Sequence, residues 1–242
     1  MRVFYEEMKE KLQSILVKYG FDEKRAEESA KNFADSSLDG VYSHGYQRFP
    51  RVIDYIQKGY IDVNAVPEKI TGFGAVERWD GHLGMGNLNA KMAMQRAVEL
   101  AAQLGIGMVA MSNTNHWMRG GAYGWQAAEA GCIGICWTNT CPNMPAWGAI
   151  DGRTVTKVGQ ECESEYGLTQ VFIAIRPEVL NQDPDKAQEI LNETLKDIQA
   201  SIPEKEGHTV RYPGQGTLIR RRENLKNGIP VNEEIWKKIC EL

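Results

Sequence analysis

The chain has 242 residues, of which 42% are hydrophobic and 25% charged, and its formal net charge is −4. These proportions are typical of folded globular domains and exclude a disordered chain, while the 24 glycines and 9 prolines are too scattered for a collagen-like one. The small negative charge provides no basic surface for nucleic acid or for an anionic membrane. We therefore expect one large or two small globular domains that bind neither.

Two features indicate the compartment. No stretch approaches the roughly 18 consecutive apolar residues of a membrane span, and Glu6 and Glu7 interrupt the N-terminus before the apolar core of a signal peptide can develop. The cysteine count is odd, and the spacings lack the paired pattern of zinc sites. We expect buried free thiols, no metal site and a cytoplasmic location.

The N-terminal third of the chain reads as helical. Apolar residues recur at helical spacing over residues 4–19 and 22–35. Ser43 is a suitable N-cap for a third helix over residues 44–57. Pro50 lies inside that span, so the helix is expected either to kink there or to start afresh.

The middle of the chain alternates between helix and strand. After an extended region over 61–88, the pattern predicts a helix at 87–103, a strand at 106–111, a helix at 121–129 and a strand at 133–138. Such alternation is typical of an α/β layer.

The C-terminal part begins with another apolar strand at 170–175. Asp183 and Pro184 suit the N-cap and first position of a helix that runs to about residue 201 with an apolar stripe. Two shorter helices follow, one ending before Gly228 and one beginning after Asn232.

His44 and Arg48 form the first candidate site. If both residues lie on one helix, they share a face one turn apart. Arginine binds carboxylates in a bidentate fork, and histidine can protonate a carbonyl oxygen that becomes an alcohol. The pair therefore suits a substrate with both groups. The spacing alone is equally compatible with a histidine at a helix start beside a solvated arginine.

Asn115 and His116 form the second candidate. They lie in a polar loop, residues 112–121, between a predicted buried strand and a helix. Strand-to-helix loops of α/β layers are where site residues gather. The alternative is a turn whose side chains only cap the following helix.

A Rossmann-type nucleotide site is not supported. Gly84 and Gly86 resemble the start of a dinucleotide fingerprint, but Asn89 stands at the third glycine position and no acidic residue completes the unit. The basic run 220–222 is most simply a solvated helix face.

Several longer motifs resemble one known family. They are Ser43-His44-Gly45, Arg48-Phe49-Pro50, Gly86-Asn87-Leu88, the run from Asn113 to Glu129, the run from Gly134 to Asn139, Glu165-Tyr166-Gly167 and Pro213-Gly214-Gln215-Gly216. Through them the chain resembles the malate/L-lactate dehydrogenase-like family, which is unrelated to the Rossmann-type lactate and malate dehydrogenases.

The resemblance implies a fold, an activity and site residues. The family fold is α/β and non-Rossmann, with N-terminal helices and a mixed central sheet. Members reduce small 2-oxo acids with NADH, NADPH being possible, and form homodimers. His44 matches the catalytic proton donor, Arg48 a ligand of the substrate carboxylate, and Asn115 and His116 the substrate-pocket loop. Gly214, Gln215 and Gly216 match a cofactor-binding loop.

The chain departs from the family at one place. Between residues 149 and 155 members carry an extra stretch on the order of ninety residues, the size of a small domain. We therefore expect an incomplete fold with an N-terminal helical segment (1–75), a partial α/β cofactor and substrate core (76–155) and a C-terminal strand with helices (156–242).

Two hypotheses follow from the resemblance and this departure. The chain is either a working 2-oxo-acid reductase or a catalytically impaired deletion remnant that only dimerises or binds partners. If the extra stretch is missing, exposed strands such as 133–138 are a liability for aggregation or for binding of partners.

Overall fold

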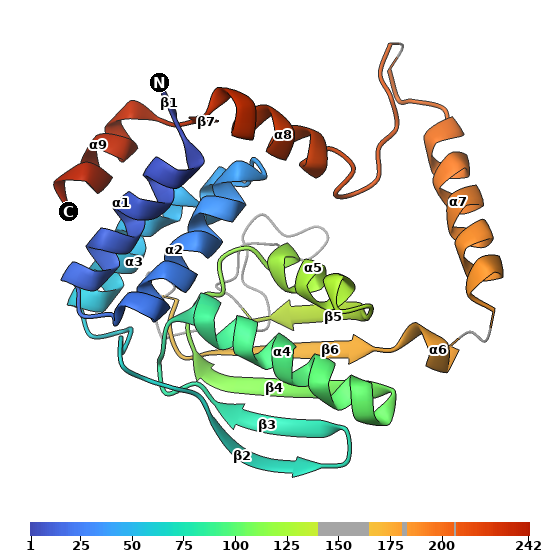
Figure 1. Cartoon of the computed structure of the whole chain (residues 1–242), viewed down its shortest axis with the longest axis horizontal. Coiled ribbons are helices and arrows are strands. Elements are labelled where there is room, and N and C mark those ends of the chain that lie inside the picture. The colour runs from blue at the N-terminus through green and yellow to red at the C-terminus, as the bar shows by residue number, and fades with distance from the viewer. Residues whose placement is uncertain (140–164, 181–182, 206) are drawn as a thin grey trace, which may run out of the picture.

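The computed structural model describes residues 1–139, 165–180, 183–205 and 207–242. Two regions stand side by side, a helical half and a sheet half (Figure 1). The helical half combines both ends of the chain: β1 (Arg2–Val3), α1 (Tyr5–Lys18), α2 (Glu23–Leu38), α3 (Phe49–Gln57), α8 (Thr217–Asn227), β7 (Ile229–Pro230) and α9 (Glu233–Glu241). β1 pairs with β7 antiparallel, so the first residues and the last helices are tied together.

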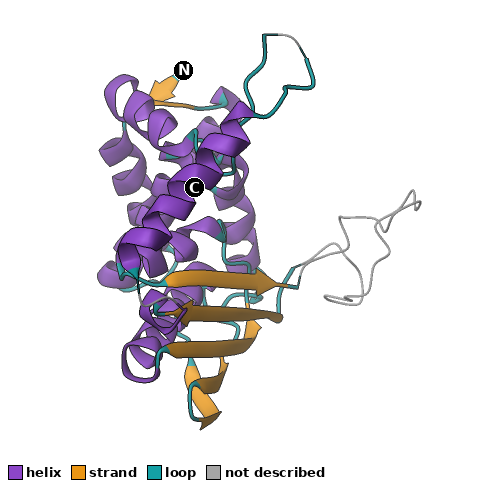
Figure 2. Cartoon of the chain, turned by 90° about the vertical axis from the view of Figure 1, so that its right-hand side faces the viewer, coloured by secondary structure: helices purple, strands orange, loops and turns teal. Residues whose placement is uncertain are grey.

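The sheet half contains five described strands, β2 (Glu68–Phe73), β3 (Val76–Asp80), β4 (Ile106–Thr114), β5 (Ile133–Thr138) and β6 (Leu168–Ile175). Their order is β2-β3-β4-β6-β5, with β3 and β4 parallel and the other neighbours antiparallel. Helices α4 (Gly86–Leu104) and α5 (Gly121–Glu129) pack against one face. In Figure 2 the helical half lies above these strands. The predicted α/β fold with N-terminal helices and a mixed sheet is confirmed.

Local signals in the sequence account for most helix ends. The Asp22 carboxylate accepts the Arg25 N–H at 3.0 Å and the Asn232 side chain accepts the Ile235 N–H at 3.1 Å, so both are N-caps. Gly105 ends α4 with φ of +82°, a left-handed conformation that glycine adopts without strain. The elements predicted over 87–138 are all present, with slightly different bounds.

The helix predicted over 44–57 starts afresh at Phe49, next to Pro50, which is one of the two outcomes expected of that proline, and the α-helical turn predicted before it is absent. Two short 3₁₀ turns, η1 (Tyr42–His44) and η2 (Tyr46–Arg48), precede α3, which starts at Phe49 with Pro50 in its first turn. Gly45 separates the turns because its backbone packs on α2: a Cβ there would lie 2.2 Å from Ser37 Oγ. His44 and Arg48 therefore do not share a helix face.

The segment after β6 leaves the body of the molecule. α6 (Pro177–Leu180) follows the strand, and α7 (Pro184–Ala200) stands apart from both halves in Figure 1. Asp183 caps α7 by accepting the Lys186 N–H at 3.0 Å, as predicted. The apolar stripe predicted for this helix is exposed, with Ile190 at 53% and Leu191 at 51%.

Two further observations concern the described residues. None of their helices is long and apolar enough to cross a membrane. Cys132, Cys136 and Cys240 are free, but Cys132 alone of the three is buried, so the expected burial is wrong for exposed Cys240. Cys141 and Cys162 lie outside the described ranges.

Candidate functional site

The turn that carries His44 is fixed on α2. The Tyr46 N–H donates to Ser37 Oγ at 2.9 Å, and that hydroxyl donates to the Phe33 carbonyl at 2.8 Å. The close packing of Gly45 on Ser37 completes the anchor. His44 is thus held beside the helical core on a short turn rather than on a helix.

The second histidine lies directly against the first. The rings of His44 and His116 stack with centroids 5.5 Å apart and an interplanar angle of 28°. His116 Nδ1 accepts the Met118 N–H at 3.0 Å, so a neutral His116 carries its proton on Nε2. His44 Nδ1 lies 3.0 Å from Ser43 Oγ. The fold brings together two residues 72 positions apart that the sequence marked as separate candidates.

The environment lowers the pKa of both rings. Burial and the nearby Arg48 charge lower the pKa of His116 to about 3, so its ring is neutral at neutral pH. Burial, followed by the Arg48 charge, also lowers the pKa of His44, while Glu165 acts in the opposite direction. A lowered pKa leaves less of the His44 ring protonated at neutral pH, while it makes the ring that is protonated a stronger acid toward a carbonyl oxygen.

Arg48 lies next to the histidine pair and is held by a residue that sequence reasoning missed. Its Nη2 forms an ion pair with Glu165 Oε2, with side-chain exposures of 17% for Arg48 and 12% for Glu165. The Glu165 N–H donates to the Tyr55 hydroxyl at 3.1 Å, and neighbouring Tyr166 stacks on Tyr60 at 4.5 Å. Glu165 belongs to the motif Glu165-Tyr166-Gly167 named above. That motif is the feature of the sequence by which Glu165 could have been identified as a candidate site residue.

Asn115 holds the loop that presents His116. Its amide nitrogen donates to the carbonyls of Tyr60, Leu83 and Gly84 at 2.7–3.0 Å, and the Gln170 amide donates to the Asn115 carbonyl at 2.8 Å. The loop also packs closely on the start of α4, because a Cβ added to Gly86 would lie only 2.2 Å from the His116 carbonyl oxygen. The Asn115 side chain is therefore anchored to backbone, while its buried Oδ1 has no partner among the described residues.

Gly214, Gln215 and Gly216 form the loop that leads into α8. In the described part, their hydrogen bonds stay within residues 212–220. Gly216 is the N-cap of α8 and supplies no side-chain cap, and nothing lies within 4 Å of a Cβ placed on Gly214 or Gly216. Among the described residues, the hydrogen bonds of this loop reach neither His44 nor His116, so the loop is separate from the histidine cluster.

α8 nevertheless places the loop near the turn that carries His44. The Arg221 Nε donates to Asp39 Oδ1 at 2.6 Å, and the Asn224 amide donates to the Leu38 carbonyl at 2.8 Å. A Cβ on Gly40 would lie 2.8 Å from Arg220 Cγ. α8 therefore packs on the end of α2 and on Gly40, which lies four residues before His44.

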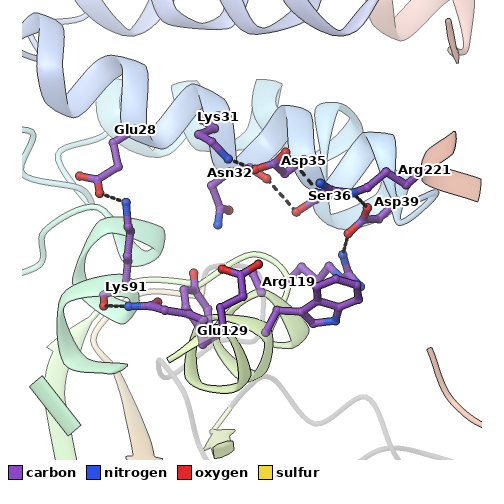
Figure 3. A pocket seen from close by; sticks show the side chains of 14 residues that line it. Glu28, Lys31, Asn32, Asp35, Ser36, Asp39, Lys91, Arg119, Glu129 and Arg221 are labelled. Carbon is purple, nitrogen blue, oxygen red and sulfur yellow. Dashed lines mark hydrogen bonds and ion pairs between the residues drawn. The ribbon is translucent and has the colours of Figure 1, made fainter. Parts of the chain in front are cut away.

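A separate cleft of about 320 Å³ lies between α2, α5 and α8 (Figure 3). Most of its charged side chains are paired with one another (Figure 3): Lys31 with Asp35, Lys91 with Glu28, Arg119 with Asp39, and Arg221 with Asp39 and Asp35. Neither His44 nor His116 lines it. The cleft is therefore a neighbour of the histidine cluster and not its binding pocket.

Comparison with known proteins gives one family. The sequence model of malate/L-lactate dehydrogenase matches residues 3–157 and 151–240. The 2,3-diketo-L-gulonate reductases of Pasteurella multocida (strain Pm70) and Escherichia coli (strain K12) are 34% and 32% identical, and each alignment covers 100% of both chains.

Solved structures have the same fold. A malate dehydrogenase from Pyrococcus horikoshii OT3 superposes with a TM-score of 0.86 at 20% identity, covering 100% of this chain and 94% of that one. A sulfolactate dehydrogenase from Methanocaldococcus jannaschii superposes with a TM-score of 0.86 at 22% identity, covering 100% and 97%.

The alignments also locate what this chain lacks. They span 333 positions, and the chain has 242 residues, so at least 91 positions have no counterpart in it. The two family matches meet at residues 151–157, between β5 and β6. The relatives therefore carry an additional segment at the place that the sequence motifs indicated.

Proposed function

This chain belongs to the malate/L-lactate dehydrogenase family and is an oxidoreductase, and from that premise we propose that it reduces a small 2-oxo acid with NADH. The observation that supports this most directly is the cluster of His44, His116 and Arg48. It joins a proton donor to a carboxylate-binding cation in a partly buried place. The substrate would carry a carbonyl next to a carboxylate.

His44 would supply the proton. Its protonated ring donates to the carbonyl oxygen as that oxygen becomes a hydroxyl. His116 stays neutral, because its pKa is lowered to about 3, and presents an Nε2–H in the same place. That N–H would orient the carbonyl by a hydrogen bond, without competing with His44 for the proton.

Arg48 would bind the substrate carboxylate. A guanidinium has five N–H donors in a planar fork, and the ion pair with Glu165 uses Nη2. Glu165 thus fixes the plane of the fork while other donors remain for the substrate. The tyrosines that hold residues 165–166, Tyr55 and Tyr60, would maintain that plane.

The loop Gly214-Gln215-Gly216 would hold part of the cofactor. A glycine loop that opens a helix exposes backbone N–H groups, and such helix starts bind phosphate groups. α8 begins without a side-chain cap, and the two glycines leave open space, so the residues present fit the pyrophosphate of a nicotinamide cofactor. When bound, this cofactor supplies the hydride.

The names of the relatives suggest the substrate. We propose the reduction of 2,3-diketo-L-gulonate to 3-dehydro-L-gulonate by a homodimer in the cytoplasm, the compartment that the odd cysteine count favours. Parallel assays with NADH and NADPH would establish the cofactor preference, and a panel of 2-oxo acids the substrate.

The decisive variant is His44→Asn. Loss of a general acid lowers turnover about 10²- to 10⁴-fold, and NADH oxidation with 2,3-diketo-L-gulonate would measure it. The exposed His208 provides a matched control, since His208→Asn should keep full turnover. Full turnover of His44→Asn would remove His44 from the reaction.

A second candidate is a protein that binds partners without catalysis. The absence of at least 91 positions that the reductases contain favours it, because that segment borders the sheet. Nicotinamide fluorescence distinguishes the two: the reductase should bind NADH, whereas no binding at about 1 mM, the upper end of ordinary KM values, would leave only the second candidate.

A further inference from the structure

Asp39 is a buried carboxylate at which three parts of the chain meet (Figure 3). It ends α2, and its side chain is only 5% exposed. Its Oδ2 accepts from Arg119 Nη1, and its Oδ1 accepts from Arg221 Nε at 2.6 Å. The chain continues from Asp39 into the turn that carries His44. No step of the proposed reaction uses this carboxylate.

Arg119 closes the loop that presents His116. Asn115 anchors the start of this loop on backbone carbonyls, and the ion pair of Arg119 anchors its end. Between the anchors, Met118 has a φ of +65°, which a residue with a side chain adopts only where its surroundings impose it. The Met118 N–H donates to His116 Nδ1. The orientation of the His116 ring therefore depends on a strained turn that Arg119 helps to hold.

Arg221 connects the same carboxylate to the glycine loop over 214–216. This loop leads into α8, and Arg221 lies in the second turn of that helix. The Asn224 amide, one turn further on, donates to the Leu38 carbonyl at 2.8 Å and holds α8 on α2. Because a helix is rigid over one or two turns, the place of Arg221 also sets the place of the loop. Asp39 thus lies between the loop proposed for the cofactor and the loop of His116.

The two arginines depend on Asp39 to different degrees. Arg221 also pairs with Asp35, from Nη2 to Oδ1 at 3.4 Å. Arg119 binds Asp39 alone among the described carboxylates. Because both guanidiniums are positive and share one buried carboxylate, loss of its charge would leave two like charges close together. Arg119, with the His116 loop, should therefore move more than Arg221 and α8.

We propose that Asp39 is a positioning residue of the reduction. Through Arg119 it orients His116 toward the carbonyl of the substrate, and through Arg221 it holds the loop over 214–216 at a fixed place relative to that ring. This inference rests on the proposed reductase function. Asp39 itself makes and breaks no bond, so its contribution lies in the geometry of transfer, where a misplacement of about 1 Å costs about 100-fold in rate.

The first test needs no cofactor. The imidazole ¹⁵N resonances of the full chain report which nitrogen of each histidine carries the proton. In the parent, neutral His116 should be the Nε2–H tautomer, because its Nδ1 accepts the Met118 N–H, and Asp39→Asn should release that bond and give a mixture of tautomers. Asp54→Asn removes an exposed carboxylate paired with Lys58 and should leave the His116 resonances unchanged. Unchanged His116 resonances in Asp39→Asn as well would overturn the proposal.

The second test isolates hydride transfer in the single-turnover oxidation of bound NADH by 2,3-diketo-L-gulonate, with NADH deuterated at the transferred position for comparison. Asp39→Asn should slow the deuterium-sensitive step about 10- to 100-fold. Its affinity for NADH, followed by nicotinamide fluorescence, should fall by less, because Arg221 keeps Asp35 as a partner. A merely structural role would lower the amount of folded protein and leave this rate constant unchanged, a result that contradicts the proposal.

Variants of Arg119 test the same contact from its other side and do not depend on the folding of Asp39→Asn. Arg119→Gln should slow hydride transfer as Asp39→Asn does, and Arg119→Lys, which keeps the charge, should recover part of the rate. The double variant Asp39→Asn with Arg119→Gln should be no slower than the slower single variant. Additive losses would mean that the two residues act separately, against the proposal.

The parent chain separates failure of this inference from failure of the proposed function. A parent that binds NADH but reduces no 2-oxo acid contradicts the reductase function and leaves Asp39 no reaction to serve. A parent that turns over, while Asp39→Asn and Arg119→Gln keep its rate of hydride transfer, overturns the positioning role alone.

Discussion

The helical half and the sheet half bury their apolar residues to different extents. In the helical half, Leu12, Leu16, Phe33 and Phe49 are fully or almost fully buried, and the rings of Phe33 and Phe49 meet edge to face at 5.2 Å. In the sheet half only the inner face, which α4 and α5 cover, has such a core. The two halves therefore differ in packing: the helical half surrounds a core, whereas the described sheet has a tightly packed core on one face only.

The junction between the halves is polar. Asp39 at the end of α2 accepts from Arg119, which follows the His116 loop, and from Arg221 of α8 at 2.6 Å. Three parts of the chain thus meet at one carboxylate that is only 5% exposed. The histidine cluster lies beside this junction, so the contact between the halves also positions the candidate site.

The largest expected effect tests the two cores directly. Phe33→Ala in the helical half and Phe172→Ala on the inner sheet face should each lower the free energy of unfolding by about 3–5 kcal/mol, because each ring is fully buried. Chemical denaturation measures both. If Phe172→Ala costs less than about 1 kcal/mol, the sheet half has no tight core and the comparison fails.

The next effect concerns the junction. Asp39→Asn removes the charge that binds two arginines and should cost about 1.5–3 kcal/mol, the range for hydrogen bonds to charged groups. Asp54→Asn is the control, since its ion pair with Lys58 is exposed and should contribute less than about 1 kcal/mol. If Asp39→Asn and Asp54→Asn lower the free energy of unfolding equally, Asp39 does not stabilise the contact between the two halves.

The third effect is a pH dependence of stability. In the native state His116 stays neutral down to about pH 3, whereas in the unfolded state it protonates below its ordinary pKa of about 6.5. The unfolded state therefore binds more protons, and stability should fall by about 1–2 kcal/mol from about pH 7 to 5. Denaturation of His116→Gln across this range should give a flatter profile, and an unchanged profile would contradict the assignment.

The smallest effect marks the limit of the sheet core. Phe73 on the edge strand β2 is 90% exposed, so Phe73→Ala should change the free energy of unfolding by no more than about 0.5 kcal/mol. The same denaturation series as for Phe33 and Phe172 measures it. If Phe73→Ala lowers the free energy of unfolding as much as Phe33→Ala and Phe172→Ala do, the β2 edge is covered in solution.

Much of this architecture is predictable from local pattern. Asp22, Gly105 and Asn232 act as caps and stops because their conformations and hydrogen bonds depend on neighbours within a few residues. The helix predicted at 44–57 starts afresh next to Pro50, as one of the two expectations had it, and its first turn is replaced by two 3₁₀ turns where Gly45 packs on Ser37 of α2. His44 and Arg48 still lie near each other, as predicted, but two consecutive 3₁₀ turns carry them instead of one helix.

The candidate site was only partly predictable. His44, Arg48, Asn115 and His116 were recognised from residue type and motif, but the stacking of the histidines depends on tertiary packing. Glu165 lies 117 positions from Arg48, and no spacing rule connects them. The apolar stripe of α7 was recognised from its spacing, but its exposure could not be, because burial depends on which other elements pack on the helix.

The pairing of β1 with β7 has a consequence for synthesis on the ribosome. The Met1 amino group pairs with Glu233 across 232 positions, and Val3 packs in one core with Ile229, Trp236 and Ile239. That core cannot close until the last residues have emerged, whereas the strands between residues 68 and 175 are already available to pair. The sheet can therefore pair during synthesis, while the core that joins the first residues to α9 still lacks one side.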